Sequence, residues 1–466
     1  MTATTGVPDT AARATRVPGP RAPRRWWADV AGSAALLSVV AVVALWLTGG
    51  GARQLTGAGV LATSAGRLTG LVAADLLLLQ VLLMARIPWV ERSYGQDALA
   101  RRHRLVGFVS FWLMLAHVVL ITIGYAQQAR TGVLREAWDL VLTYPGMLLA
   151  AAGTALLVAV VVLSVRAARR ALRYESWHLL HLYAYLGVGL ALPHQLWTGR
   201  DFVSSPVARA YWWTAYGGTL AAVVIFRLAV PLWRSAYHRL EVAVVAPEAP
   251  GVVSVYLRGR HLDRLPVRAG QFFLWRFLDG PGWMRAHPYT LSAVPGTGRL
   301  RITVKDLGDG SARAATLRPG TRVLIEGPYG AMTSVRRPRP KVLLMAAGVG
   351  ITTMRALLED LTGDVTLVYR VSRLDDAVFA AELDELARRR GARVLYLDGP
   401  RPDRESWMPR RFAHVSDVAG LRWLVPDVAD REVYLCGPPQ WMDTARAAAR
   451  DAGVPARHLH LEEFAW

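Results

Sequence analysis

Four histidines lie in two long apolar segments, His103 and His117 in one and His181 and His194 in the other. Ionisable side chains are costly inside a membrane and usually mark a functional site there. Fourteen residues of α-helix rise about 21 Å and return to within about 40° of the starting face, so His103 and His117 can serve opposite sides of a bilayer. Imidazoles in both axial positions of haem iron suit electron transfer. We therefore predict two stacked b-type haems.

The direction of the two helices predicts the pairing. If both begin in the cytoplasm, His103 faces His181 on the inner side and His117 faces His194 on the outer side. The 13-residue spacing of His181 and His194 turns an ideal helix by about 140°, so this helix needs a distortion, for which Pro193 is a source. Two alternatives remain: His178 replaces His181, or the histidines only pack in the protein interior.

These histidines require membrane-spanning helices, and the composition agrees: 53% of residues are hydrophobic and the mean hydropathy is +0.24. Segments of roughly 18 to 20 residues suit a hydrocarbon core about 30 Å thick. Six are predicted, at residues 30–47, 68–85, 105–124, 147–165, 177–196 and 211–232. Arginines cluster at 21–25, 101–104 and 166–173, which places both termini and the C-terminal half in the cytoplasm of a multi-pass plasma-membrane protein.

The net charge of +20 comes almost entirely from arginine, much of it flanking apolar segments, so we expect no nucleic-acid partner. Cys436 is the only cysteine, which excludes an all-cysteine iron–sulfur cluster, an intrachain disulfide and a cysteine-rich zinc site.

The pattern changes after the sixth segment. Short alternating strands separated by Gly/Pro turns predict an antiparallel β-barrel, and strands alternating with helices from Lys341 predict a doubly wound parallel sheet. The predicted domains are a disordered basic tail without the apolar region of a cleavable signal (1–25), a six-helix transmembrane bundle (26–234), an FAD-binding β-barrel (235–337) and an NAD(P)-binding α/β domain (338–466).

The segment His287-Pro288-Tyr289-Thr290-Leu291-Ser292 resembles the flavin motif of ferredoxin reductase-like domains. In such a motif an aromatic ring lies against the isoalloxazine, a hydroxyl lies near its N5 edge and a donor points to the pyrophosphate, roles that fall here to Tyr289, Thr290 and His287. A second element with Lys305, Gly310 and Ser311 follows, and the latter two open a helix whose amides can bind phosphate. A further segment that matches such domains, Glu326-Gly-Pro-Tyr-Gly330, comes next along the chain.

Nicotinamide motifs occupy the α/β half. Gly348 and Gly350, followed by Ile351 and Thr352, lie between a predicted strand and a helix, where the backbone can approach a pyrophosphate. In similar enzymes a Ser-Arg pair at the end of the next strand grips the adenosine 2′-phosphate, which favours NADPH over NADH. The remaining predicted cofactor residues are Arg370, Ser372, Arg373, Cys436, Gly437 and Pro438.

The histidine spacings, placed ahead of a flavin domain, resemble the ferric reductase and NADPH oxidase superfamily. The resemblance implies that Arg67 and Arg86 lie near the outer and inner haems, although snorkelling would also explain them. It places Cys436 beside the nicotinamide and a C-terminal aromatic, Phe464 or Trp466, over the flavin, so these residues and Thr290 would serve hydride transfer. Animal NADPH oxidases carry another histidine where this chain has Ile121, which argues against superoxide as the main product.

The resemblance implies that electrons pass from cytoplasmic NAD(P)H through FAD and two haems to an outer acceptor, either a ferric chelate or oxygen. One alternative is a haem-bearing electron-transfer subunit that reduces a partner protein or a quinone. Another treats the spans as an anchor for a soluble reductase. Asp75, midway along the second apolar segment, is either a buried polar partner or part of a proton path.

Overall fold

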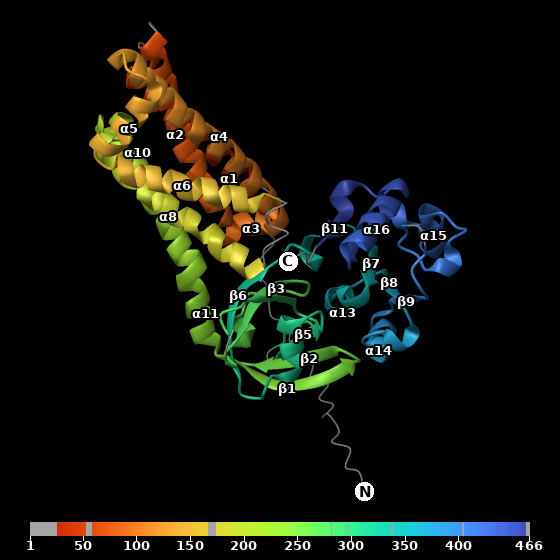
Figure 1. Cartoon of the computed structure of the whole chain (residues 1–466). Coiled ribbons are helices and arrows are strands. Elements are labelled where there is room, and N and C mark those ends of the chain that lie inside the picture. Colours follow the sequence, from red (N-terminus) through yellow and green to blue (C-terminus); the bar gives the residue numbers. More distant parts are fainter. Residues whose placement is uncertain are drawn as a thin grey trace. The chain divides into compact units, whose positions relative to one another are not determined.

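The structure is a computed structural model that describes residues 26–52, 58–165, 174–280, 282–296, 298–336, 339–402 and 405–462. The described residues form two compact units, divided between Leu228 and Ala229. Figure 1 shows their helices and strands and labels many of them. The predicted basic tail and the two C-terminal aromatics, Phe464 and Trp466, lie outside the described residues, as do the arginines at 166–173.

The first unit is helical because its segments are long, apolar and rarely interrupted by proline. Its helices are α1 (Trp26–Thr48), α2 (Ala58–Met84), α3 (Pro88–Tyr94), α4 (Gln96–Ala129), α5 (Val133–Thr143), α6 (Met147–Ser164), α8 (Tyr174–Thr198), α9 (Arg200–Val203) and α10 (Pro206–Val223). A π-helical turn, Val224–Ala229, joins α10 to α11 (Val230–His238) of the second unit. Helix α2 packs along α4, and α6 packs along α8.

Large apolar side chains of this unit are exposed, among them Leu105, Phe108 and Trp112 of α4, as expected for lipid-facing helices. Among the described residues, five helical segments are long and apolar enough to cross a membrane: 26–48, 59–84, 98–129, 147–164 and 206–238. They match five of the six predicted spans. The other predicted span, 177–196, lies in the 25-residue helix α8, which is not among the five. The count of six spans therefore stays a prediction.

The second unit begins with an antiparallel sheet of six strands in the order β4-β3-β6-β1-β2-β5. A single bridge between Leu291 and Ile302 joins the segment after β4 to β5 at the other edge. Alternating inward residues such as Val255, Phe273 and Trp275 form its core. Closure into a full barrel stays a prediction. The strands are β1 (Leu240–Ala249), β2 (Val252–Arg258), β3 (Phe272–Phe277), β4 (His287–Thr290), β5 (Leu300–Lys305) and β6 (Arg322–Tyr329).

A parallel five-stranded sheet completes the second unit, with the order β11-β10-β7-β8-β9. Strand β7 is buried along its whole length, as expected for a sheet covered on both faces. The elements are β7 (Val342–Ala347), α13 (Ile351–Asp360), β8 (Val365–Val371), α14 (Ala380–Arg390), β9 (Arg393–Asp398), α15 (Asp417–Leu424), β10 (Glu432–Cys436), α16 (Pro439–Asp451) and β11 (Leu459–Leu461). The predicted order of an antiparallel sheet and then a parallel sheet is confirmed.

Candidate functional site

The structure brings the four histidines together in the predicted pairs. The rings of His103 on α4 and His181 on α8 have centroids 6.0 Å apart, and those of His117 and His194 have centroids 6.4 Å apart. Both pairs join α4 to α8 at different levels of the two helices. Helix α8 includes Pro193 without a break in its residue range. The distortion at Pro193 stays a prediction.

Hydrogen bonds orient the histidines of α4. Nδ1 of His103 lies 3.0 Å from the carbonyl oxygen of Gln80, and Nδ1 of His117 lies 2.8 Å from that of Gly66. A carbonyl only accepts, so each Nδ1 carries the proton and Nε2 keeps a free lone pair, as in metal-binding histidines. On α8, Nδ1 of His181 lies 3.3 Å from Ser164 Oγ. The side chain of His178 lies outside the described residues.

The separation of the rings fits an iron ion between each pair. An imidazole nitrogen binds a transition-metal ion at about 2 Å, and the ring centre lies about 1 Å behind that nitrogen, so two axial imidazoles have ring centres about 6 Å apart. Both observed separations match this value. Within the described residues, no three His, Cys, Asp or Glu side chains are grouped so that they could hold a metal ion.

Both arginines of the α2 region form ion pairs rather than merely snorkelling. Arg67 donates Nε to Oδ2 of Asp201 at 2.7 Å, and a second nitrogen donates to Oδ1. Arg86 lies 3.4 Å from Oε1 of Glu91, and both side chains are buried. Asp201 and Glu91 were not singled out in the sequence, because an acid far along the chain or on a short helix gives no local signal of its partner.

The flavin motif forms β4 and brings its residues against the second motif. The rings of His287 and Tyr289 are nearly parallel, with centroids 5.9 Å apart. A Cβ at Gly310 would lie 2.9 Å from Cε1 of His287, so only glycine lets the helix α12 (Asp309–Ala312) approach this ring. The Oγ1 of Thr290 is buried and has no hydrogen-bond partner among the described residues. A flavin fits there, since such a hydroxyl needs a partner.

The flavin motif and the nicotinamide motifs are linked by side chains that the sequence did not single out. Thr290 pairs with Phe272 across the strands β4 and β3, and a Cβ at Gly330 would lie 3.3 Å from the Phe272 ring. It would also lie 2.6 Å from Oε1 of Glu462, whose charge acts on Cys436. Glu462 therefore lies close to Gly330, which follows β6, and its charge reaches Cys436 at the end of β10.

Cys436 is fully buried at the end of β10, with its Sγ 3.9 Å from Oγ1 of Thr353. Burial, with a smaller contribution from Glu462, raises the pKa of the thiol to about 12, so it stays protonated and is not a nucleophile. A Cβ at Gly350 would lie 2.9 Å from the backbone nitrogen of Gly437. Because glycine has no Cβ, the ends of β7 and β10 can meet here. A Cβ at Gly348 would meet nothing, so the space above this loop is open.

Arg370, near the end of β8, and Arg373, just after it, differ in their environment. Arg370 is buried and donates to the carbonyl oxygens of Val371, Gly399 and Pro400, so it is engaged by the backbone at the ends of β8 and β9. Arg373 is 74% exposed and lies 3.3 Å from Asp375, which is also exposed. Ser372, next to Arg373, is also exposed.

The other predicted cofactor residues are placed as follows. Ser292 is buried, and its hydroxyl lies 2.8 Å from Oγ1 of Thr303, while Lys305 is exposed at the end of β5. Ile351 and Thr352 open α13 and are buried, Pro288 lies in β4, and Pro438 directly precedes α16.

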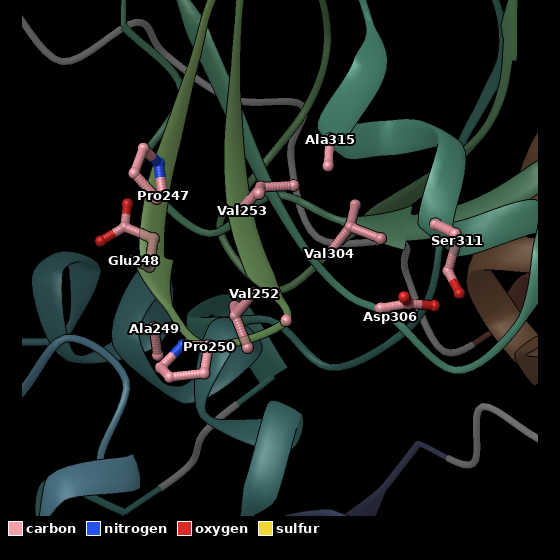
Figure 2. Close-up of a pocket in the computed structure, with 12 residues that line it drawn as sticks. Pro247, Glu248, Ala249, Pro250, Val252, Val253, Val304, Asp306, Ser311 and Ala315 are labelled. Carbon is pink, nitrogen blue, oxygen red and sulfur yellow. The ribbon is translucent and has the colours of Figure 1, made fainter.

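A pocket of about 530 Å³ adjoins the second flavin motif. Figure 2 shows Asp306 and Ser311 on one side of it, facing Pro247 and Glu248 of β1. The hydroxyl of Ser311 donates to the carbonyl oxygen of Gly308 and accepts from the amide of Leu307, so it holds the turn before α12. The pocket therefore offers room beside the residues expected to bind phosphate.

Comparison with known proteins agrees with both units. Residues 69–192 match the family model described as "Ferric reductase like transmembrane component", and residues 344–447 match "Oxidoreductase NAD-binding domain". The ferredoxin reductase component of 3-ketosteroid-9-alpha-monooxygenase from Mycolicibacterium smegmatis is 33% identical over 43% of this chain and 57% of its own length. The stachydrine N-demethylase reductase subunit Stc4 from Rhizobium meliloti is 31% identical over 48% and 66%. The chain thus spans less than two thirds of these relatives.

Among solved structures, the flavohem-like FAD/NAD binding domain of nitric oxide dioxygenase from Vibrio cholerae is 25% identical with a TM-score of 0.39, covering 49% of this chain and 98% of that one. A ferredoxin reductase in carbazole 1,9a-dioxygenase is 23% identical with a TM-score of 0.41, covering 49% and 69%. The sequence and fold define a multi-pass membrane protein with a ferredoxin reductase-type FAD/NAD domain. Residues 69–192 are thus similar to a ferric reductase transmembrane component, and residues 344–447 are similar to an oxidoreductase NAD-binding domain.

Proposed function

We propose that the chain is a plasma-membrane oxidoreductase that passes electrons from cytoplasmic NAD(P)H through FAD and two b-type haems to an acceptor on the outer side. The observation that carries the proposal is the pair of histidine contacts between α4 and α8, with ring centroids 6.0 and 6.4 Å apart. They lie in a chain whose other unit joins a flavin motif to a nicotinamide motif.

The residues present fit the implied groups. His103 with His181 would hold the inner haem, and His117 with His194 the outer haem. When bound, FAD accepts a hydride and releases single electrons, and haem iron carries one electron at a time. The chain's own part is to fix distance and orientation.

In the second unit, Tyr289 would lie against the isoalloxazine and the unpartnered hydroxyl of Thr290 would donate to its N5 edge. His287, Gly310 and Ser311 would bind the pyrophosphate. The neutral Cys436 would line the nicotinamide site as a small apolar group, and Phe464 or Trp466 would cover the flavin until the nicotinamide displaces it. Gly348 and Gly350 leave room for the second dinucleotide.

NADPH is the proposed donor, because Arg373 is exposed after β8, the strand that pairs with β7 ahead of the open Gly348 loop, and a guanidinium suits the 2′-phosphate. Arg101, Arg102 and Arg104 near the start of α4 set the proposed side of the membrane, with both termini and the reductase domain in the cytoplasm.

The proposed acceptor is a ferric chelate or oxygen. A second candidate is an electron-transfer subunit that reduces a partner protein or quinone. It is favoured by the relatives' names, a "ferredoxin reductase component" and the "2-halobenzoate 1,2-dioxygenase electron transfer component" from Burkholderia cepacia.

Visible spectra of the purified protein, taken before and after NADPH under argon, test the proposal. We expect haem absorption bands that change to those of reduced haem after NADPH is added. We also expect lower haem content in the His117→Ala and His194→Ala variants. Full haem content in both variants would rule out the two-haem arrangement. Rapid reduction of ferric chelate or oxygen would support the first acceptor class, whereas haem reduction without turnover would support the second.

A further inference from the structure

Asp75 is a buried acid near the middle of α2 and is only 2% exposed. Ser38 of α1 donates to its Oδ1 at 2.5 Å, and Tyr211 of α10 donates to the same oxygen at 2.7 Å. The two hydroxyl oxygens are 2.9 Å apart. Three helices therefore meet at one carboxyl oxygen. The other oxygen, Oδ2, is buried and has no hydrogen-bond partner among the described residues.

Asp75 differs from the other buried acids of this unit. Asp201 and Glu91 form ion pairs with Arg67 and Arg86, whereas Asp75 forms no ion pair within the described residues. The titratable groups that face it are two phenols of α10, Tyr211 and Tyr216, and α1 contributes only the Ser38 hydroxyl. When Asp75 is ionised, no positive side chain among the described residues pairs with it to offset the cost of burying its charge.

The position of Asp75 on α2 separates it from the histidines. The carbonyls of Gly66 and Gln80 hold His117 and His103, so these positions mark the face of α2 that packs against α4. Nine residues after Gly66, the helix has turned by about 180° and risen about 14 Å. Asp75 therefore lies on the opposite face of α2, at a depth between the two histidine pairs.

We propose that Asp75, with Ser38 and Tyr211, is a proton-binding site inside the membrane that fills when the transmembrane domain gains an electron. The proposal rests on the proposed function. One electron enters from the flavin side, and one proton from water forms an O–H bond at Oδ2, which converts the carboxylate to the neutral acid. When the electron leaves for the acceptor, that bond breaks and the proton returns to water.

The charges are close enough to couple. Along the axis of α2, Asp75 lies about 14 Å from Gly66 and about 8 Å from Gln80, the residues whose carbonyls contact the two histidine pairs. At these distances an added negative charge and a carboxylate repel each other, and binding a proton at the carboxylate removes this repulsion. Because Oδ2 has no protein partner among the described residues, it can receive the proton without breaking a bond to Ser38 or Tyr211.

Infrared difference spectra of the full chain in detergent, reduced minus oxidised and recorded in H2O and D2O, test this site. Reduction of the wild type should add the carbonyl band of a protonated carboxylic acid, which shifts in D2O. Asp75→Asn should lack the band, and Tyr211→Phe should retain it at another frequency, since one hydrogen bond is lost. The control is Asp139→Asn, which changes an acid with a 51% exposed side chain and should leave the band unchanged.

Visible spectra of the same samples separate the two proposals. If the wild type shows no reducible haem, the proposed function fails and the proton site fails with it. If haem is reduced but the carbonyl band is absent, or the band persists in Asp75→Asn, only the proton site is overturned. If Asp75→Asn does not fold, an unmoved band in Tyr211→Phe overturns the assignment to Asp75.

Discussion

The outer histidine pair, His117 and His194, depends on Gly70 of α2, which has no side chain. A Cβ at Gly70 would lie 2.8 Å from Cε1 of His117 and closer still to its Nδ1. Real Cβ atoms do not approach this closely, so either the imidazole or the helix must move. Such overpacking costs about 1 to 3 kcal/mol, and the ring would lose its bond to the Gly66 carbonyl.

We therefore predict that Gly70→Ala lowers the haem content from about two per chain toward one. The pyridine haemochrome assay against protein concentration measures this ratio. Gly189→Ala on α8 is the matched control, because a Cβ there would meet nothing and alanine favours a helix by about 1 kcal/mol. Unchanged haem content in Gly70→Ala would contradict the assignment of His117.

Arg373 and Arg370 should separate cofactor choice from stability. Arg373→Ala removes an exposed guanidinium, so we expect stability to change by no more than about 0.5 kcal/mol and KM for NADPH to rise about tenfold while that for NADH stays unchanged. Arg370→Ala leaves buried carbonyls without donors and should cost about 2 to 4 kcal/mol. Steady-state kinetics with both nucleotides, and thermal release of flavin fluorescence, measure the two effects. Equal use of NADH and NADPH by wild type and Arg373→Ala would remove the case for NADPH.

At the scale of elements, a buried ionic network joins the two sheets of the second unit. Glu382 of α14 accepts from Arg301 of β5 at 3.1 and 3.2 Å and also from Arg355 of α13. Both arginines donate to the carbonyl of Ser292, at the end of the flavin motif. The network connects the flavin strand to the helix that follows the nicotinamide loop, so it helps to fix their separation.

This network should make stability sensitive to acid. Burial alone would raise the pKa of Glu382, but the charges and hydrogen bonds of Arg355 and Arg301 outweigh it and hold the pKa below its usual value. A lowered pKa stabilises the folded state above the unfolded pKa of about 4.3, and that stabilisation is lost as pH falls through the folded pKa. We predict that Glu382→Gln is less stable than wild type at pH 7 and loses less on acidification. Chemical unfolding followed by flavin fluorescence from pH 7 to below pH 4 measures both; parallel curves would contradict the prediction.

For the whole molecule, the proposed route separates flavin reduction from delivery across the membrane. In sealed vesicles, His117→Ala should keep NADPH-dependent reduction of a dye that accepts electrons from the flavin. The same variant should lose most reduction of an acceptor on the other side of the membrane, because the outer pair is incomplete. Stopped-flow flavin absorbance and acceptor reduction measure the two steps. Equal acceptor reduction by variant and wild type would show that electrons leave before the outer pair.

The amino-acid sequence alone determined the class of protein, because the signals for that class are local. Apolar length predicted five segments that match candidate membrane-spanning helices among the described residues, and the strand and helix patterns predicted an antiparallel sheet followed by a parallel sheet. The family matches agree with the predicted superfamily. The expected common direction of the two histidine-bearing helices also predicted which histidines pair, and the ring separations agree with that pairing.

Only the tertiary structure decided which side chains are partners. Arg67 with Asp201, Glu382 with two arginines, and Asp75 with Ser38 and Tyr211 join residues far apart in the chain, so no local pattern contains them. Arg370 and Arg373 belong to one sequence motif but differ in the structure. Arg370 is buried and bound by carbonyl oxygens, whereas Arg373 is exposed. The physical reason is that burial and hydrogen bonding depend on how helices and sheets pack.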